Sequence, residues 1–339
     1  MLRKRYNLNW VYDTPDAVST CSILQCKGNA YLIFGGHDKT LYLMNTELEI
    51  IQEVEFDGWC RCSYPIDLNR DGCEEVLIGT GDGRCLVFRF DAEKEELHPI
   101  MNYRVNGFIN CCTAGDFYGN GNIELIFGGE DKSLRIFESI HSKKPLERLY
   151  YDSWVTACQL GYLKIPEYTT PIHVLLVGTR NGLLQFIHIK NNSPDILWQI
   201  DLKSKINVIK IDDVANDGYN EIVVATDDGY VKILDALGHR LRYIKLQKSR
   251  GVSLLIEDID SDNAKELLVG CADGTFKVYH NTQLESLDFQ LKWKTKVSTS
   301  VKTICCALDD VQNEKHIIFG GYDRTIRDVS DFEVGEKPE

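Results

Sequence analysis

Hydrophobic and polar positions alternate in short runs along the chain, and one pattern returns every 44 to 50 residues. An apolar run ending in a small residue is followed by a tight turn and then by a second run of alternating character. This is the sequence form of a β-hairpin. The seven hairpins read LIFGGHDKTLYLMN, VLIGTGDGRCLVF, LIFGGEDKSLRIF, LLVGTRNGLLQFI, IVVATDDGYVKIL, LLVGCADGTFKVY and IIFGGYDRTIRDV.

The centre of each turn is a pair that begins with Asp or Asn. The pairs are Asp38-Lys39, Asp82-Gly83, Asp131-Lys132, Asn181-Gly182, Asp228-Gly229, Asp273-Gly274 and Asp323-Arg324. The four pairs that end in Gly predict type I′ turns, which need positive φ at both residues. The three that end in Lys or Arg predict a bulged or less ideal turn.

Two further strands accompany each hairpin. An apolar run such as INVIKIDDV precedes it, and a more polar run such as LWQIDL lies further upstream. Four strands are the content of one propeller blade, and a period of 40 to 50 residues is typical of such repeats. No helical periodicity interrupts the series.

The two ends of the chain predict how the ring closes. The chain starts with a strand of the fourth type at residues 8–14 and stops after the third strand of the seventh repeat. Pairing these segments removes an exposed sheet edge. We therefore predict an all-β, seven-bladed propeller with four antiparallel strands per blade, formed as one domain by residues 1–332, with residues 8–14 completing blade 7 and a flexible acidic tail at 333–339.

A loop rich in Asp recurs between the first and second strands of four blades. It reads DLNRDGCEE, DFYGNGNIE, DVANDGYNE and DIDSDNAKE. This loop, followed by an apolar strand ending in Gly, resembles the FG-GAP or VCBS repeat of integrin-α-like propellers, and the resemblance covers nearly the whole chain. The WD40 repeat is the nearest alternative, but the chain lacks its Trp-Asp dipeptide.

The resemblance implies Ca²⁺ binding, because in integrin-like members this loop holds that ion through oxygen ligands. Two loops keep all four side-chain positions. They are Asp67, Asn69, Asp71 and Glu75, and Asp258, Asp260, Asp262 and Glu266. A metal-free interpretation is equally available, because an Asp at the first position can accept backbone N–H bonds in an Asx-type turn. We expect these loops to serve mainly as turns between strands and expect no required cofactor. Binding of Ca²⁺ is an alternative confined to these two loops.

Composition narrows the functional classes. The net charge of -13 argues against a nucleic-acid binder, since phosphate neutralisation needs a basic surface. No signal peptide or membrane-spanning run is evident. The twelve cysteines have no CxxC spacing and fall in strand-like stretches, where cysteine acts as a small hydrophobe. These features predict a reducing, cytoplasmic setting.

The connections that lead into each blade carry the candidate binding residues. Aligning the repeats gives Val18, Trp59, Phe108, Trp154, Lys205, Arg250 and Val301, with Arg61 close by and Lys39 and Lys132 further out. Aromatic residues beside Arg or Lys are typical of protein-interaction hot spots. Packing between the blades is the alternative role for the aromatics.

We therefore predict a non-catalytic scaffold or complex subunit that binds other proteins through one face of the ring. No Gly-rich phosphate loop, zinc helix or nucleophile elbow occurs in the chain. A Ca²⁺-dependent extracellular adhesion-like propeller is the main alternative. An enzyme with an axial active site is the third.

Overall fold

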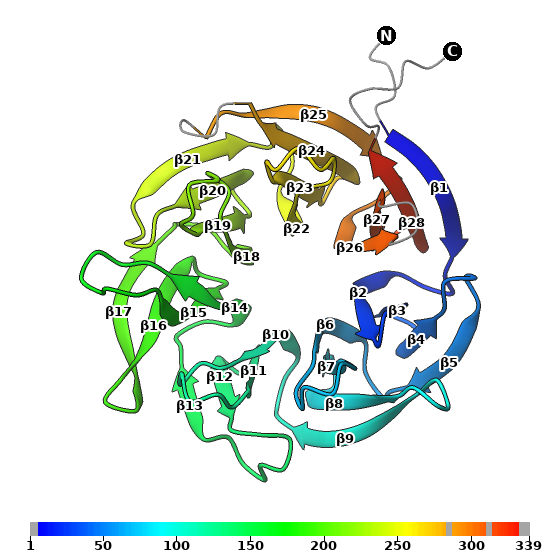
Figure 1. Cartoon of the computed structure of the whole chain (residues 1–339), viewed down its shortest axis with the longest axis horizontal. Coiled ribbons are helices and arrows are strands. Elements are labelled where there is room, and N and C mark those ends of the chain that lie inside the picture. Colours follow the sequence, from blue (N-terminus) through cyan, green and yellow to red (C-terminus); the bar gives the residue numbers. More distant parts are fainter. Residues whose placement is uncertain (1–5, 283–286, 310–313, 332–339) are drawn as a thin grey trace.

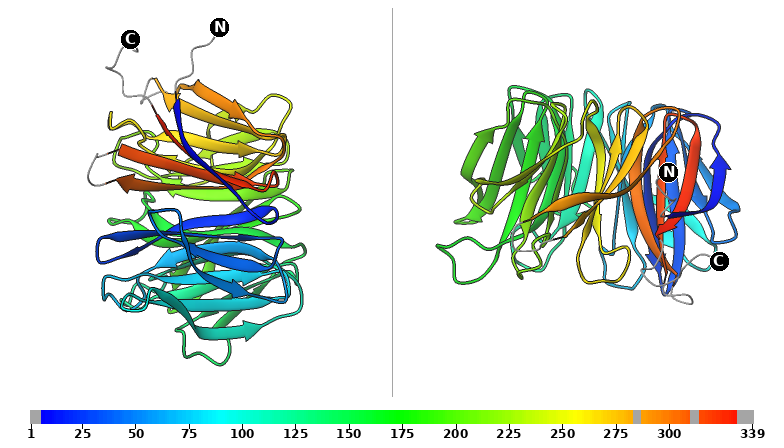
Figure 2. Two further views of the ribbon diagram at one scale, coloured as in Figure 1. Left: turned by 90° about the vertical axis from the view of Figure 1, so that its right-hand side faces the viewer. Right: turned by 90° about the horizontal axis from the view of Figure 1, so that it is seen from above.

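The computed structural model describes residues 6–282, 287–309 and 314–331. They form seven four-stranded antiparallel sheets that stand side by side in a ring (Figure 1). The predicted fold class is therefore confirmed. From the side the ring is a disc, with loops on both faces (Figure 2). No described helix is long and apolar enough to cross a membrane. The segment 333–339, predicted as an acidic tail, lies outside the described residues.

In blades 1 to 6 the strands follow chain order from the axis to the rim, and in blade 7 the rim strand is β1. Blades 1 to 3 consist of β2(Val18–Cys26), β3(Asn29–Gly36), β4(Thr40–Met44) and β5(Ile50–Glu55), then β6(Cys60–Ile66), β7(Glu75–Thr80), β8(Arg84–Asp91) and β9(Glu96–Arg104), then β10(Ile109–Gly115), β11(Glu124–Gly129), β12(Ser133–Phe137) and β13(Glu147–Tyr150). Blades 4 and 5 consist of β14(Val155–Leu163), β15(Ile172–Thr179), β16(Leu183–Lys190) and β17(Ser193–Asp201), then β18(Ile206–Asp212), β19(Glu221–Thr226), β20(Tyr230–Leu234) and β21(Arg240–Lys245). Blades 6 and 7 consist of β22(Gly251–Glu257), β23(Glu266–Cys271), β24(Thr275–Asn281) and β25(Phe289–Lys296), then β26(Val301–Asp309), β27(Glu314–Gly321), β28(Thr325–Asp331) and β1(Tyr6–Asp13).

Blade 7 is completed by the amino-terminal strand, as the pattern predicted. Strand β1 pairs antiparallel with β28 from Tyr6 opposite Asp331 to Asp13 opposite Thr325. Tyr6 also stacks on Trp293 of blade 6, with ring centroids 4.9 Å apart. The closing strand thus contacts two blades.

The four hairpin turns whose pairs end in Gly differ from the predicted type I′. Only the second residue of each pair has positive φ, including Gly83 at 86° and Lys132 at 60°. In five of the turns the N–H of this residue donates to the carbonyl three residues earlier, as Gly83 does to Thr80. This is a type I turn followed by one left-handed residue, the usual three-residue hairpin. Turns with Gly, Lys or Arg in this place have the same left-handed residue.

The core consists of seven apolar clusters among the described residues, one at each interface between neighbouring blades. Small residues at the end of each second strand allow this packing. A Cβ added to Gly128 would lie 2.5 Å from Cγ1 of Val155 in the next blade. Blade-to-blade packing therefore explains the recurring glycine.

One cysteine pair departs from the expected reduced state. Cys26, at the end of β2, forms a disulfide with Cys73 in the loop before β7, and so joins blades 1 and 2. The other ten cysteines are free, and eight of them are buried. These eight match the predicted role as small core hydrophobes.

A β-bulge begins the innermost strand of every blade. The pairing with the second strand shifts by one residue there, for example between Cys60 and Cys62 of β6. A bulge leaves one residue unpaired and redirects its side chain. The seven bulged residues are Ser19, Arg61, Asn110, Thr156, Asn207, Val252 and Lys302.

Candidate functional site

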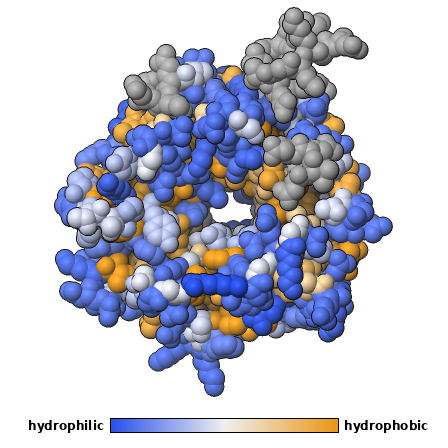
Figure 3. Space-filling model, viewed as in Figure 1, coloured by the Kyte–Doolittle hydropathy of each residue, from blue (hydrophilic) through white to orange (hydrophobic). Residues whose placement is uncertain are grey.

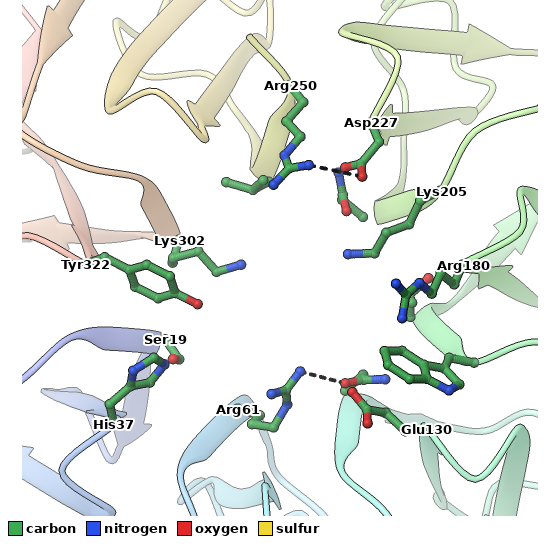
Figure 4. A pocket seen from close by; sticks show the side chains of 15 residues that line it. Ser19, His37, Arg61, Glu130, Arg180, Lys205, Asp227, Arg250, Lys302 and Tyr322 are labelled. Atoms are coloured by element: carbon green, nitrogen blue, oxygen red, sulfur yellow. Dashed lines mark hydrogen bonds and ion pairs between the residues drawn. The ribbon is translucent and has the colours of Figure 1, made fainter.

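The bulged residues of all seven blades line one cavity at the axis of the ring. Its volume is about 710 Å³, within the range of small-molecule sites. The space-filling view shows an opening at the centre of the ring (Figure 3). The chain order of the blades runs clockwise in Figure 1 and counterclockwise in Figure 4. Figure 4 therefore views the cavity from the opposite face of the ring.

Two more residues of each blade surround the bulged one. The connection residue just before the innermost strand accepts a hydrogen bond, through its carbonyl, from the N–H of the residue that precedes the hairpin pair. The bonds are Ala17 with His37, Trp59 with Gly81, Phe108 with Glu130, Trp154 with Arg180, Lys205 with Asp227, Arg250 with Ala272, and Ser300 with Tyr322. This repeated bond sets both residues at the same end of every blade.

Cations dominate the charge of the cavity. Arg61, Arg180, Lys205, Arg250 and Lys302 extend toward the axis from several directions (Figure 4). Two carboxylates, those of Glu130 and Asp227, accompany them. This excess of positive charge stands in a chain whose net charge is -13.

Most of these cations lack a carboxylate partner. Asp227 pairs with Arg250 at 3.3 Å and accepts a hydrogen bond from Asn207 at 2.7 Å. Arg61 donates to the neutral amide oxygen of Asn110 at 2.8 Å, and its buried Nε has no hydrogen-bond partner. Within the described chain, no ion pair is formed by Arg61, Arg180, Lys205 or Lys302.

Two lysines of the cavity, Lys302 and Lys205, have lowered pKa values. Burial, together with the positive charges of Lys205, Arg61 and Arg250, lowers the pKa of Lys302 to about 8. Burial also lowers the pKa of Lys205, with Asp227 opposing the change. Like charges that share a partly desolvated space favour an anion among them.

An aromatic arc, defined as Phe108, Trp59, His37 and Tyr322, borders the cavity. His37 stacks on Trp59 with centroids 4.3 Å apart and lies 5.0 Å from Tyr322. Trp59 lies 6.2 Å from Phe108 and is 38% exposed. Further round the ring, the guanidinium of Arg180 lies 4.1 Å from the ring centroid of Trp154.

Four of the predicted binding residues line the open end of the cavity, here called the mouth: Arg61, Trp154, Lys205 and Arg250. Trp59 and Phe108 do not line it but lie beside it, against His37 and Arg61 respectively. Lys39 and Lys132 are exposed at hairpin tips and are not among the residues that line the cavity. The alignment was wrong at Val18 and Val301, which are buried, because the register places Ala17 and Ser300 in those connections.

Sequence reasoning missed the residue before each hairpin pair and most of the bulged residues. His37, Glu130, Arg180, Asp227 and Lys302 therefore escaped notice. The pre-turn position can be found by counting back one residue from each turn pair. The bulged position has no comparable signal, because the bulge breaks the strand alternation on which the alignment depends.

The Asp-rich loops have a recurrent structure of their own. In blade 2, the Asp67 carboxylate accepts N–H bonds from Asp71 and Gly72, and Asn69 accepts one from Asp71. Glu75 accepts the N–H of Leu68 and pairs with Arg89 at 2.8 Å. Asp116 and Asp213 repeat the first arrangement, as does Asp258.

In blade 6 four side chains converge. Ligand atoms of Asp260, Asp262, Glu266 and His280 lie within 4.8 Å of one another. The ammonium of Lys292 lies 2.5 Å from Asp260 and 3.8 Å from Glu266. Asp258 stays outside this group and binds backbone N–H groups.

In both complete loops a side-chain cation already contacts the ninth-position glutamate, Arg89 at Glu75 and Lys292 at Glu266. A Ca²⁺ ion would have to displace that cation or accept its repulsion. The observed bonds favour the Asx-type interpretation.

No model of a known protein family matches the chain, and no curated protein sequence matches it significantly.

Proposed function

We propose that the protein is a non-catalytic binding module that docks a partner protein on the face carrying the hairpin turns. The observation that supports this most directly is the aromatic arc beside the cations of the mouth. Aromatic and Arg side chains contribute most to interface hot spots. A closed ring loses little conformational freedom on docking, which favours affinity.

The charged groups of the cavity are suited to binding an anion. Asp227 is engaged by Arg250 and Asn207. The unpaired groups are mainly cations from different blades, which suit the attraction of an anion. We infer that the partner offers acidic as well as apolar side chains at this face.

The proposed role as a scaffold is based on the repeated Asp-rich loop. The shared loop bonds of blades 2, 3, 5 and 6 support the FG-GAP-type interpretation. We extend this to a scaffold or complex subunit that acts in the cytoplasm.

The test is a double substitution, Trp59→Ala with Trp154→Ala. Tagged wild-type and variant proteins are used for affinity purification from the native cell, followed by binding assays with the purified partner. The matched control replaces two exposed aromatics outside the mouth, Tyr150→Ala with Tyr219→Ala. We expect the partner to be lost only from the mouth variant. Equal recovery by all three proteins would remove this face from consideration.

One observation favours the extracellular alternative, the disulfide between Cys26 and Cys73. Disulfides persist mainly in oxidising compartments. Alkylation of the denatured protein without reductant distinguishes the two settings. Twelve labelled cysteines fit a cytoplasmic protein, whereas ten labelled cysteines favour the extracellular one.

A further inference from the structure

The cavity contains four cations that no described carboxylate neutralises. Arg61, Arg180 and Lys302 each lie near an aromatic ring, at 5.0, 4.1 and 5.6 Å from the centroids. Aromatic faces attract cations only weakly compared with an anion. The charge therefore remains available to a ligand.

These side chains come from the same end of their blades. Arg61 and Lys302 occupy equivalent bulges of blades 2 and 7. Lys205 is a connection residue and Arg180 a pre-turn residue at the same end of their blades. Figure 4 shows them extending from different sides into a common space. A ligand that satisfies all four must be compact and carry charge in several directions.

Three neutral side chains of the cavity, Asn110, Thr156 and Asn207, are already hydrogen-bonded within the ring. The Asn110 amide donates to the Val155 carbonyl, and the Asn207 amide donates to Asp227 and the Gly251 carbonyl. Thr156 donates to the Ile206 carbonyl. The remaining donors are chiefly the cations, so the cavity selects for negative charge.

We propose that this cavity binds a compact anion carrying several phosphate groups. Each phosphate brings a charge of about -1.5 to -2 and three acceptor oxygens, so two or three groups match four cations. Arg side chains recognise phosphate through paired N–H donors. A peptide carries one carboxylate per residue, and four of them would extend over roughly 13 Å of chain rather than form one compact group.

The site adjoins the proposed docking face and shares its cations, since Trp154 of that face contacts Arg180. A partner would contact the aromatic arc at the rim, whereas the anion would lie among the axial cations. Either activity can therefore fail alone: loss of partner capture tests the docking face, and loss of anion binding tests the cavity.

Calorimetric titration with inorganic tripolyphosphate tests the proposal. The variant is Arg61→Gln with Lys302→Gln, and the control is Lys143→Gln with Lys144→Gln, which removes the same charge from exposed positions on blade 3. We expect the Kd to rise at least tenfold in the cavity variant and to stay within twofold in the control. Equal weakening in both variants would show a general charge effect and overturn the site.

A hexaglutamate peptide distinguishes phosphate from carboxylate at the same ionic strength. We expect it to bind at least tenfold more weakly than tripolyphosphate. If its affinity is equal or higher, the cavity recognises acidic peptide and the phosphate proposal is wrong.

Proton uptake on binding tests whether the anion lies beside Lys302. Lys302 faces Lys205, Arg61 and Arg250 together with Asp227, and its pKa lies at about 8. A bound anion raises that pKa, so binding at pH 8 takes up protons. Titrations in Tris and in HEPES buffers, which differ in ionisation enthalpy, measure the uptake. Because tripolyphosphate itself releases protons on binding to cations, the wild type is compared with Lys302→Gln. We expect the wild type to take up more protons than the variant; equal proton exchange in both would place the anion elsewhere.

Discussion

Lys132 occupies a backbone conformation that favours glycine. Its φ is 60°. The equivalent residue of every other hairpin turn also has positive φ, and in four blades that residue is Gly. A side chain in the left-handed region costs about 1 kcal/mol or more, and a turn tolerates it only because the flanking strands fix the geometry. The lysines at these tips therefore lower the stability of the fold slightly.

Replacing Lys132 with Gly removes this strain. We expect Lys132→Gly to raise the free energy of unfolding by up to about 1 kcal/mol, since part of the gain is offset by the greater freedom of Gly in the unfolded chain. Urea denaturation measures the change. Lys143→Gly, at an exposed lysine without positive φ, should lower stability. A loss in both variants contradicts the role assigned to strain.

Glu221 provides a second test at the scale of single residues. One oxygen of its buried carboxyl accepts the N–H groups of Val214 and Ala215 at 3.0 and 3.1 Å. Burial raises its pKa from 4.5 to about 7. Between these values the folded state keeps a proton that the unfolded chain releases, so this group favours folding at low pH and loses that contribution as pH rises toward 7.

A glutamine at position 221 keeps the accepting oxygen without the charge. We expect Glu221→Gln to gain stability relative to the wild type as pH increases from 5 to 8, measured by urea unfolding at both values. Glu53→Gln, on an exposed part of β5, is the control. A difference from the wild type that is the same at both pH values would show that the titration of Glu221 is not responsible.

At the scale of elements, the hairpins were predictable and the innermost strands were not. Strand alternation and turn pairs are local signals, so they located the seven hairpins and hence the blades. The bulge at the start of each inner strand depends on pairing with the second strand, which leaves no local mark. For this reason Arg61 was found only as a neighbour of Trp59, while Lys302 was missed.

The Asp-rich loops show the same division between local pattern and spatial environment. Their spacing suggested Ca²⁺, but Arg89 and Lys292 come from other strands of the blade. A buried ammonium between carboxylates can take the electrostatic place of a metal ion. The sequence of the loop alone does not show which cation it holds.

Thermal unfolding with and without Ca²⁺ tests this substitution. We expect 1 mM Ca²⁺ to leave the Tm of the wild type unchanged within about 1 °C. In Lys292→Ala the carboxylates of blade 6 lose their cation, so Ca²⁺ should raise the Tm by several degrees. Lys294→Ala, at an exposed lysine on the same strand, should behave like the wild type. A strong Ca²⁺ effect on the wild type would contradict the assignment.

At the scale of the whole molecule, stability depends on the closure of the ring. Each blade buries its faces against two neighbours, and β1 covers the outer edge of β28. An uncovered edge presents unpaired backbone groups and favours association with another chain. The closure was predicted correctly because the chain begins with a strand of the fourth type and ends one strand short of a complete blade.

Removal of residues 1–13 should therefore lower the stability of the ring and promote association, although the segment is short. We expect the shortened chain to unfold at a lower temperature and to form dimers or larger species, observed by light scattering after size exclusion. A synthetic peptide of residues 6–14, added in excess, should restore the monomer, whereas a scrambled peptide should not. A monomeric, equally stable truncated chain would show that β1 is dispensable.

The pairing of Tyr6 with Asp331 also determines how the molecule bears mechanical load. A tether pulling on these two positions acts across the strands and not along them. The backbone bonds of the seam then break one after another, as in a zipper, and the force needed is that of a single pair. A propeller held at both ends would thus open at blade 7 under weak tension, and the six other blades would still be folded at that moment.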